Sequence, residues 1–252
     1  MANYVKLLNN LEALNLEKTR SIIPEYLDEV SANNISFIDA LTFLTDKEIV
    51  FKNKRASIAN IKVAAFPFER SLEDFDFDFQ PSINKNMIMD LASLRFVEKN
   101  ENIIFLGSSG VGKSHLSTAI GRIAAAKRYS TYFINFQKLI STLSKAHYEN
   151  KFDQKLITYS KYKVLIIDEI GYLPIDKKGA NLFFQLISKR YEKKSTIITT
   201  NQSFSKWGEI FGDPVLANAI LDRLVHHSKI IKIAGPSYRT KDKISLEKPA
   251  KM

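Results

Sequence analysis

One segment of the sequence has the residue types and spacing of a phosphate-binding loop. Gly107-Ser-Ser-Gly-Val-Gly-Lys-Ser114 fits the pattern G-x-x-x-x-G-K-S, between an apolar run expected to be a strand (102–106) and a stretch expected to be a helix (115–127). In such a loop the backbone amides face the β- and γ-phosphates, the lysine neutralises charge, and the serine hydroxyl reaches magnesium. The segment therefore predicts a site for ATP and Mg2+. The expected nucleotide-binding residues are Gly107, Ser108, Ser109, Gly110, Val111, Gly112, Lys113, Ser114 and His115.

A second apolar run ends in two carboxylates, as the other half of such a site requires. Val164-Leu-Ile-Ile is followed by Asp168 and Glu169. We expect Asp168 to hold magnesium together with Ser114, and Glu169 to polarise the attacking water as the general base. The alternative is that the pair only caps a helix. With a phosphate-binding loop upstream, the pair favours hydrolysis over transfer to a small-molecule acceptor.

Two further positions are candidates for catalysis. Asn201 ends a third expected strand (196–201), where it could orient the hydrolytic water or be an ordinary turn residue. Arg223 precedes an expected strand (229–233) and could reach the γ-phosphate held by a neighbouring subunit, with Arg190 as its rival. Either arginine could equally form a surface ion pair.

The net charge of +10 is unevenly distributed along the chain. Residues 1–100 carry 12 basic and 15 acidic side chains, whereas residues 101–252 carry 25 and 12. A basic surface confined to one domain is typical of proteins that bind a phosphate backbone, which makes duplex DNA the expected partner. The candidate DNA contacts are Lys138, Lys145, Lys151 and Lys155, although a solvated helix face would have the same composition.

The absence of cysteine limits the metal chemistry. It excludes disulfides, thiolate zinc sites and cysteine nucleophiles, so any metal must be held by oxygen or histidine. We expect the adjacent pair His226-His227 to be structural, because neighbouring side chains do not converge on one ion and no third ligand is evident nearby. The favoured metal is therefore magnesium beside the nucleotide.

The elements that position these residues form an α/β fold with a parallel sheet flanked by helices, preceded by a small all-α domain. We expect a helical domain at residues 1–60, a linker and the start of the ATPase domain at 61–100, the core at 101–240, and a basic tail at 241–252. The helical domain could dock a partner protein or be a packing appendage. No apolar run is long enough to span a bilayer and no secretory signal is present, so we expect a cytoplasmic protein with no membrane contact.

The order of the motifs resembles the IstB family of transposition helper ATPases. The resemblance covers roughly residues 5–240 and depends most on Asp168-Glu-Ile-Gly-Tyr-Leu-Pro174, Ile220-Leu-Asp-Arg223 and Gly235-Pro-Ser-Tyr-Arg239. It implies an AAA+ fold related to the helicase loader DnaC. In such a protein Lys113 and Ser114 serve nucleotide and magnesium, Asp168 and Glu169 form the Walker B pair, Asn201 is sensor 1, and Arg223 is the finger acting in trans.

The same resemblance implies a purpose. Family members assemble as homo-oligomers on duplex DNA with ATP, bend the DNA, and deliver it to an IstA-like transposase that stimulates hydrolysis. One departure from standard AAA+ proteins is visible, because only about nineteen residues follow Ile233, too few for a C-terminal helical lid. Arg239 could substitute for the missing sensor-2 arginine. The alternatives are a DnaC-like replicative helicase loader, a small-molecule kinase, and an adaptor with a vestigial site.

Overall fold

The computed structural model describes residues 2–241, which divide into two compact units. We refer to residues 2–59 as the N-terminal unit and to residues 60–241 as the sheet unit. Among the helices of residues 2–241, none combines the length and the apolar character that a membrane crossing requires.

The N-terminal unit consists of helices with a small core. Its elements are α1 (Ala2–Ala13), α2 (Glu17–Ala32) and α3 (Phe37–Val63), the last of which ends within the sheet unit. Tyr26 is buried and stacks on Phe43 at 4.5 Å between ring centroids, and Thr19 N donates to the buried carboxylate of Glu48 at 2.8 Å. Large apolar side chains nevertheless remain exposed on α3, including Phe37 at 79% and Ile38 at 73%.

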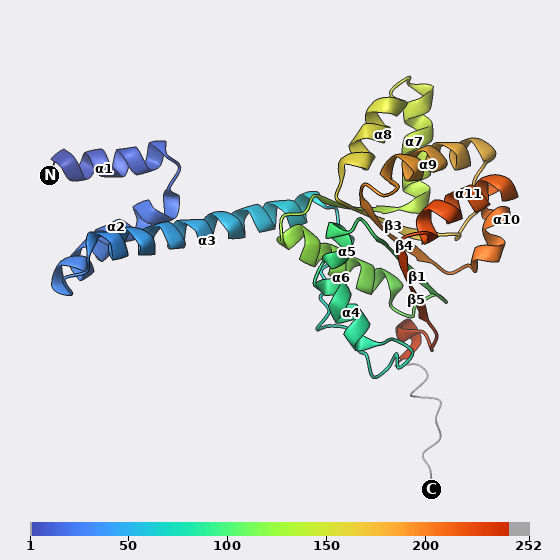
Figure 1. The fold of residues 1–252 in the computed structure, drawn as a ribbon, viewed down its shortest axis with the longest axis horizontal. Coiled ribbons are helices and arrows are strands. Elements are labelled where there is room, and N and C mark those ends of the chain that lie inside the picture. Colours follow the sequence, from blue (N-terminus) through green and yellow to red (C-terminus); the bar gives the residue numbers. More distant parts are fainter. Residues whose placement is uncertain (1, 242–252) are drawn as a thin grey trace, which may run out of the picture. The chain divides into compact units, whose positions relative to one another are not determined.

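The sheet unit is built on five parallel strands in the order β2-β3-β4-β1-β5 (Figure 1). The strands are β1 (Asn102–Gly107), β2 (Thr131–Asn135), β3 (Val164–Ile170), β4 (Ser195–Thr200) and β5 (Ser228–Ile233). The expected α/β fold with a parallel sheet is confirmed. Because β1 lies next to β4, which pairs with β3, the phosphate-binding loop and the Asp168-Glu169 pair lie at the same carboxyl edge.

Helices cover both faces of this sheet, and the strand side chains alternate between two cores. Ile104, Ile167 and Ile198 face a core shared with α7 to α11, whereas Ile103, Ile166 and Ile197 face a core shared with α4 to α6. The elements are α4 (Lys85–Ala92), α5 (Arg95–Glu98), α6 (Lys113–Ala126), α7 (Phe136–Tyr148), α8 (Phe152–Lys161), α9 (Lys177–Arg190), α10 (Trp207–Phe211) and α11 (Pro214–Val225), with short 3-10 turns η1 (Phe204–Lys206) and η2 (Tyr238–Thr240). After β5 the described residues contain the turn η2 and reach residue 241, so most of the expected basic tail at 241–252, and most of the stretch after β5 in which no lid is expected, lie outside the described residues.

The segment expected to be a linker packs onto the sheet unit. Leu72, Phe75 and Ile83 are buried in the same core as Ile103 and Ile120. Phe75 also restricts which residue can occupy position 112 of the phosphate-binding loop, because a Cβ atom at Gly112 would lie 2.5 Å from the Phe75 ring. Gly112 has φ +101°, a conformation that favours glycine, so both space and backbone conformation require this residue.

Candidate nucleotide-binding site

A cavity of about 350 Å3 lies at the carboxyl edge of the sheet. Three segments line it: the phosphate-binding loop from Ser109 to His115 with Glu169, the stretch between Phe68 and Gln80, and the pair Tyr238 and Arg239. Of the nine residues expected to bind nucleotide, seven line the cavity. The other two, Gly107 and Ser108, contribute backbone carbonyls to Lys113. The lining therefore unites segments far apart in the sequence.

The Lys113 ammonium lies within the phosphate-binding loop. Its Nζ donates to the carbonyls of Gly107 at 2.8 Å and Ser108 at 2.6 Å. Burial lowers the pKa of Lys113, and this effect is opposed by the nearby negative charges of Asp168 and Glu169. Because α6 begins at Lys113, the positive end of its dipole also faces the cavity. The loop thus presents a concentrated positive potential suited to phosphate groups.

Ser114 and Asp168 meet at the edge of the cavity. Ser114 Oγ donates to Asp168 Oδ1 at 2.8 Å, and Thr199 Oγ1 donates to the same carboxylate oxygen at 2.5 Å. Burial raises the pKa of Asp168, while the hydrogen bonds from Thr199 and Ser114 and the charge of Lys113 lower it. A hydroxyl and a carboxylate side by side are hard oxygen ligands of the kind that Mg2+ prefers, so the residues fit this ion.

Thr199 also positions the residue next to Asp168. Its Oγ1 accepts from the backbone N–H of Glu169 at 2.9 Å. Glu169 has φ 65°, an uncommon conformation for a residue other than glycine, asparagine or aspartate. A single buried hydroxyl therefore fixes the carboxylate of Asp168 and the backbone of Glu169. The sequence analysis did not assign this role to Thr199, although the residue lies within the quoted strand.

Asn135 is a second residue that the sequence analysis missed. Its Nδ2 donates to Glu169 Oε2 at 2.8 Å, while its Oδ1 accepts from Gln137 N at 2.9 Å and so caps α7. The register of β2 and β3 pairs Asn135 with Asp168, which explains the proximity. The only signal in the sequence was an asparagine between an expected strand and a helix.

Asn201 lies at the same edge but does not touch the carboxylate pair. It follows β4, is exposed, and lies outside the set of residues that line the cavity. Within residues 2–241, no hydrogen bond joins Asn201 to Asp168 or Glu169, and the contacts from β4 to the pair come from Thr199.

The two candidate arginine fingers lie in very different environments. Arg190 is 1% exposed, and its guanidinium donates to Thr196 Oγ1 and to the carbonyls of Tyr159, Tyr162 and Ser195. Because it is enclosed within its own sheet unit, Arg190 cannot reach a neighbouring subunit, and the rival assignment is wrong. Arg223 on α11 is half-buried, donates to Ala219 O at 2.9 Å, and lies over the ring of Phe184. It does not line the cavity of its own chain.

The four candidate DNA-binding lysines are all exposed on α7, on α8 or just before α8. Lys145 and Lys151 both form ion pairs with Glu149, at 3.9 Å and 3.6 Å. These two charges are partly neutralised, so Lys138 and Lys155 are the stronger candidates of the set.

The segment after β5 forms a further wall of the cavity through Tyr238 and Arg239. Tyr238 N donates to the carbonyl of Gly110 at 2.9 Å, and Gln80 Nε2 donates to Pro236 O at 2.8 Å. Lys241 Nζ contacts Asp76 Oδ2 at 2.6 Å, which fastens the same segment to the stretch before α4. Arg239 faces the cavity and adds to the positive potential that lowers the pKa of Lys113.

Comparison with known proteins agrees with this geometry. The sequence profile of the family described as IstB-like ATP binding protein matches residues 9–245. The chain belongs to this family. It is 51% identical over 245 residues to the insertion sequence IS232 putative ATP-binding protein of Bacillus thuringiensis subsp. berliner, covering 97% of this chain and 98% of that protein. It is 42% identical over 233 residues to the insertion sequence IS21 putative ATP-binding protein of Pseudomonas aeruginosa, covering 92% of this chain and 88% of the relative.

A solved structure places this IstB-like chain among the AAA+ proteins. The crystal structure of the DnaC helicase loader matches with a TM-score of 0.50 and 27% identity, over 60% of this chain and 92% of DnaC. The P-loop AAA+ fold and the likeness to helicase loaders that the sequence indicated are therefore confirmed. The cavity beside the phosphate-binding loop is therefore the candidate ATP-binding site of this IstB-like protein.

Proposed function

We propose that this chain is a Mg2+-dependent ATPase that assembles on duplex DNA and delivers it to a transposase. The observation that carries the proposal is a cavity lined by Ser114 and Glu169 in an IstB-like protein, with Asp168 hydrogen-bonded to Ser114. A vestigial site would not need a buried hydroxyl that fixes the Asp168 carboxylate and the Glu169 backbone together.

The residues divide the work of hydrolysis among them. Lys113 exchanges its two carbonyl partners for phosphate oxygens, and the loop amides hold the remaining charge. Ser114 and Asp168 would hold Mg2+, which would supply positive charge beside the phosphates. Glu169 accepts the proton of the attacking water. Arg239, in the segment that closes the cavity, supplies a further positive charge in place of a lid arginine.

The proposed partners follow from the surface of the chain. The excess of basic residues lies beyond residue 100, and it suits a phosphate backbone. The N-terminal unit carries exposed Phe37, Ile38 and Leu41, an apolar set of the kind that docks a partner protein. We assign the DNA to the sheet unit and the transposase to the N-terminal unit.

The test of this function is the ATPase rate with and without duplex DNA, combined with electron microscopy of the mixture. We expect DNA to raise the rate and ATP to produce rings or filaments on the DNA. The proposed DNA-binding function would be contradicted if duplex DNA left the ATPase rate unchanged and the protein stayed monomeric under all conditions in a sizing experiment.

Arg223 is expected to act on the ATP of a neighbouring subunit. Lys113→Ala should lose nucleotide binding, and Arg223→Ala should bind ATP but hydrolyse it poorly. An equal mixture of the two should recover roughly a quarter of the parental rate, the fraction of interfaces that pair an intact loop with an intact arginine in a random oligomer. The control is the double variant Lys113→Ala/Arg223→Ala, which supplies neither group. Mixed in equal amounts with either single variant, it should give no activity. Failure of the mixture to recover activity would exclude Arg223 as a finger in trans.

Asn135 is expected to restrain Glu169 before DNA binds. Its hydrogen bond occupies Glu169 Oε2, one of the two oxygens that could accept from the attacking water, so Asn135→Ser should raise the basal ATPase rate by up to about tenfold. Serine retains a cap for α7. Asn84→Ser is the matched control, because Asn84 caps α4 in the same way through Met87 N and lies outside the cavity. A basal rate that changes equally in both variants would show that only the helix cap matters.

A DnaC-like helicase loader is the second candidate, favoured by the structural likeness to DnaC. The two functions would share the ATPase core and differ in the protein that the N-terminal unit holds. Co-purification with a replicative helicase would favour the loader, and co-purification with the transposase of an insertion sequence would favour the transposition helper.

A further inference from the structure

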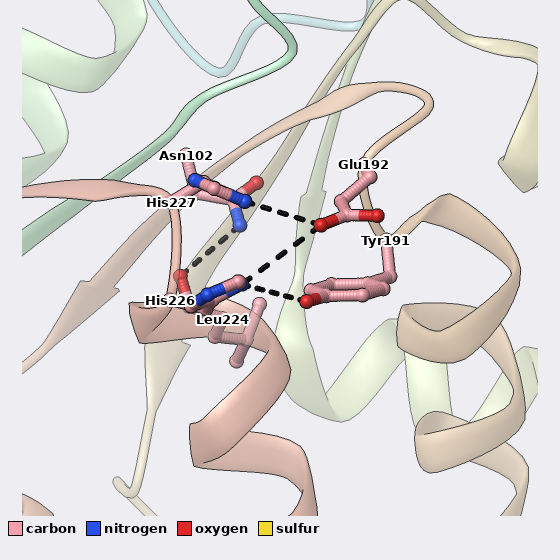
Figure 2. A network of polar contacts seen from close by, with 6 residues as sticks. All are labelled: Asn102, Tyr191, Glu192, Leu224, His226 and His227. Atoms are coloured by element: carbon pink, nitrogen blue, oxygen red, sulfur yellow. Dashed lines mark hydrogen bonds and ion pairs between the residues drawn. The ribbon is translucent and has the colours of Figure 1, made fainter.

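Three ligand-type side chains converge at the amino-terminal edge of the sheet, opposite the nucleotide cavity. His227 Nε2 lies 3.1 Å and His226 Nδ1 lies 3.9 Å from the same oxygen, Oε1 of Glu192 (Figure 2). All three ligand atoms lie within 4.8 Å of one another. From the sequence alone, the two rings were not expected to converge on one ion, and no third ligand was evident nearby. That expectation is wrong, because Glu192, 35 residues before His227, supplies the third side chain.

We propose that Glu192, His226 and His227 bind a divalent cation of the late first-row series, with Zn2+ as the representative ion. Two ligands that each lie about 2.1 Å from a tetrahedral Zn2+ are roughly 3.4 Å apart, and the two distances to Glu192 lie on either side of this value. Two imidazoles with one carboxylate suit Zn2+, Ni2+, Cu2+ and Co2+ better than Mg2+, which prefers oxygen ligands. The fourth position is left to water.

Asn102, at the start of β1, forms hydrogen bonds with the turn that carries the two histidines and with β4, which follows the loop of Glu192. The N–H of Asn102 donates to His227 O at 2.7 Å, and its Nδ2 donates to Leu224 O at 3.0 Å, which fixes the turn that holds the two histidines (Figure 2). Its Oδ1 accepts from Thr196 N, next to the start of β4. A metal site gains affinity when its ligands are held in place before the ion arrives.

The loop that carries Glu192 is fixed as well. Lys193 N and Lys194 N both donate to the carbonyl of Arg190 at 3.0 Å, and Arg190 itself is buried. Glu192 has φ 58°, a strained conformation for glutamate that is often found at functional sites. Strain of this kind persists only where neighbouring contacts impose it, and here those contacts hold the carboxylate beside both rings.

Tyr191 completes the surroundings of the site. Its hydroxyl lies 2.6 Å from His226 Nδ1, so this hydrogen bond must break when the ion takes the nitrogen. A phenol is neutral near pH 7 and is therefore a poor metal ligand. We therefore exclude Tyr191 from the ligand set and expect Tyr191→Phe to retain binding.

The experiment uses full-length protein without an affinity tag, stripped with EDTA and titrated with ZnCl2 by calorimetry in excess MgCl2. We expect one Zn2+ per chain, and Glu192→Gln, His226→Gln and His227→Gln should each weaken binding about tenfold or more. These side chains are exposed, so the variants should fold. Co2+ should give the visible absorption of a tetrahedral site, and Zn2+ should raise the melting temperature of the parent but not of His227→Gln.

His147→Gln is the matched control, because His147 is an exposed histidine on α7 outside the cluster. It should bind Zn2+ as the parent does. The proposal is overturned if no heat of binding is detected at roughly 0.1 mM Zn2+, or if the ligand variants bind as tightly as the parent. Equal weakening in His147→Gln, or loss of binding in Tyr191→Phe, would also contradict the assigned ligands. None of these outcomes depends on the proposed ATPase function.

Discussion

Glu169→Gln is expected to abolish turnover while leaving ATP binding intact. Glutamine has nearly the same shape and its Oε1 can still accept from Asn135 Nδ2, but it cannot take a proton from water. Loss of a general base lowers a rate by about a hundredfold to ten-thousandfold, so we expect kcat to fall by at least about a hundredfold. Single-turnover hydrolysis and nucleotide titration on the same preparation separate the two effects.

The same variant also tests the coupling between ATP and assembly. If hydrolysis dismantles the oligomer, Glu169→Gln with ATP should accumulate rings or filaments on duplex DNA that the parent forms only transiently. Glu209→Gln is the control, because Glu209 is exposed on α10 and lies outside the cavity. A rate for Glu169→Gln within about twofold of the control would mean that another group activates the water.

The parts of the site that the sequence predicted are those built from contiguous residues. The phosphate-binding loop is one turn between β1 and α6, and Asp168-Glu169 follows directly from the apolar residues of β3. Local geometry determines both, so spacing alone was sufficient. The parallel sheet followed for the same reason, because strands and helices alternate along the chain.

The contacts that were missed depend on how separate strands align. Asn135 meets Glu169 through the register of β2 and β3, and Thr199 meets Asp168 through the pairing of β3 and β4. No property of either residue by itself reveals the partner. The closure of the cavity by Tyr238 and Arg239 likewise requires the return of the chain after β5 to Gly110.

The environments of the charged and metal-ligating residues likewise could not be predicted from the sequence alone. Arginine is a residue type usually found at the surface, and only the tertiary structure shows that backbone carbonyls enclose the guanidinium of Arg190. His226 and His227 are adjacent, but they lie in the turn after α11, where the backbone changes direction and allows both rings to face Glu192. Long-range packing determined the outcome in both cases.

Arg190 is also the residue whose replacement should destabilise the fold most. Its Nη1 donates to Tyr159 O and Tyr162 O at 2.9 Å, and its Nη2 donates to Ser195 O at 2.5 Å. It thereby joins the end of α8 to the start of β4. Burial lowers the pKa of Arg190 to about 9, so the side chain is still charged at pH 7 and its donors remain available.

Arg190→Met replaces these donors with a thioether of similar length. Three carbonyls then lose their hydrogen-bond partner, and each loss lowers the free energy of unfolding by about 1–3 kcal/mol. The variant no longer buries a charge, and this offsets part of the loss. We expect a net loss of roughly 3 kcal/mol or more in the free energy of unfolding. Urea denaturation followed by the fluorescence of Trp207, a buried residue of the same unit and the sole tryptophan of the chain, measures it directly.

Lys189→Met is the matched control for this loss. Lys189 precedes Arg190 on α9 and is exposed, so the same chemical change should leave the unfolding midpoint nearly unaltered. A similar midpoint for both variants would mean that water or a rearranged side chain satisfies the three carbonyls. A large difference at an unchanged denaturant dependence would show that the buried guanidinium, rather than helix propensity, holds α8 and β4 together.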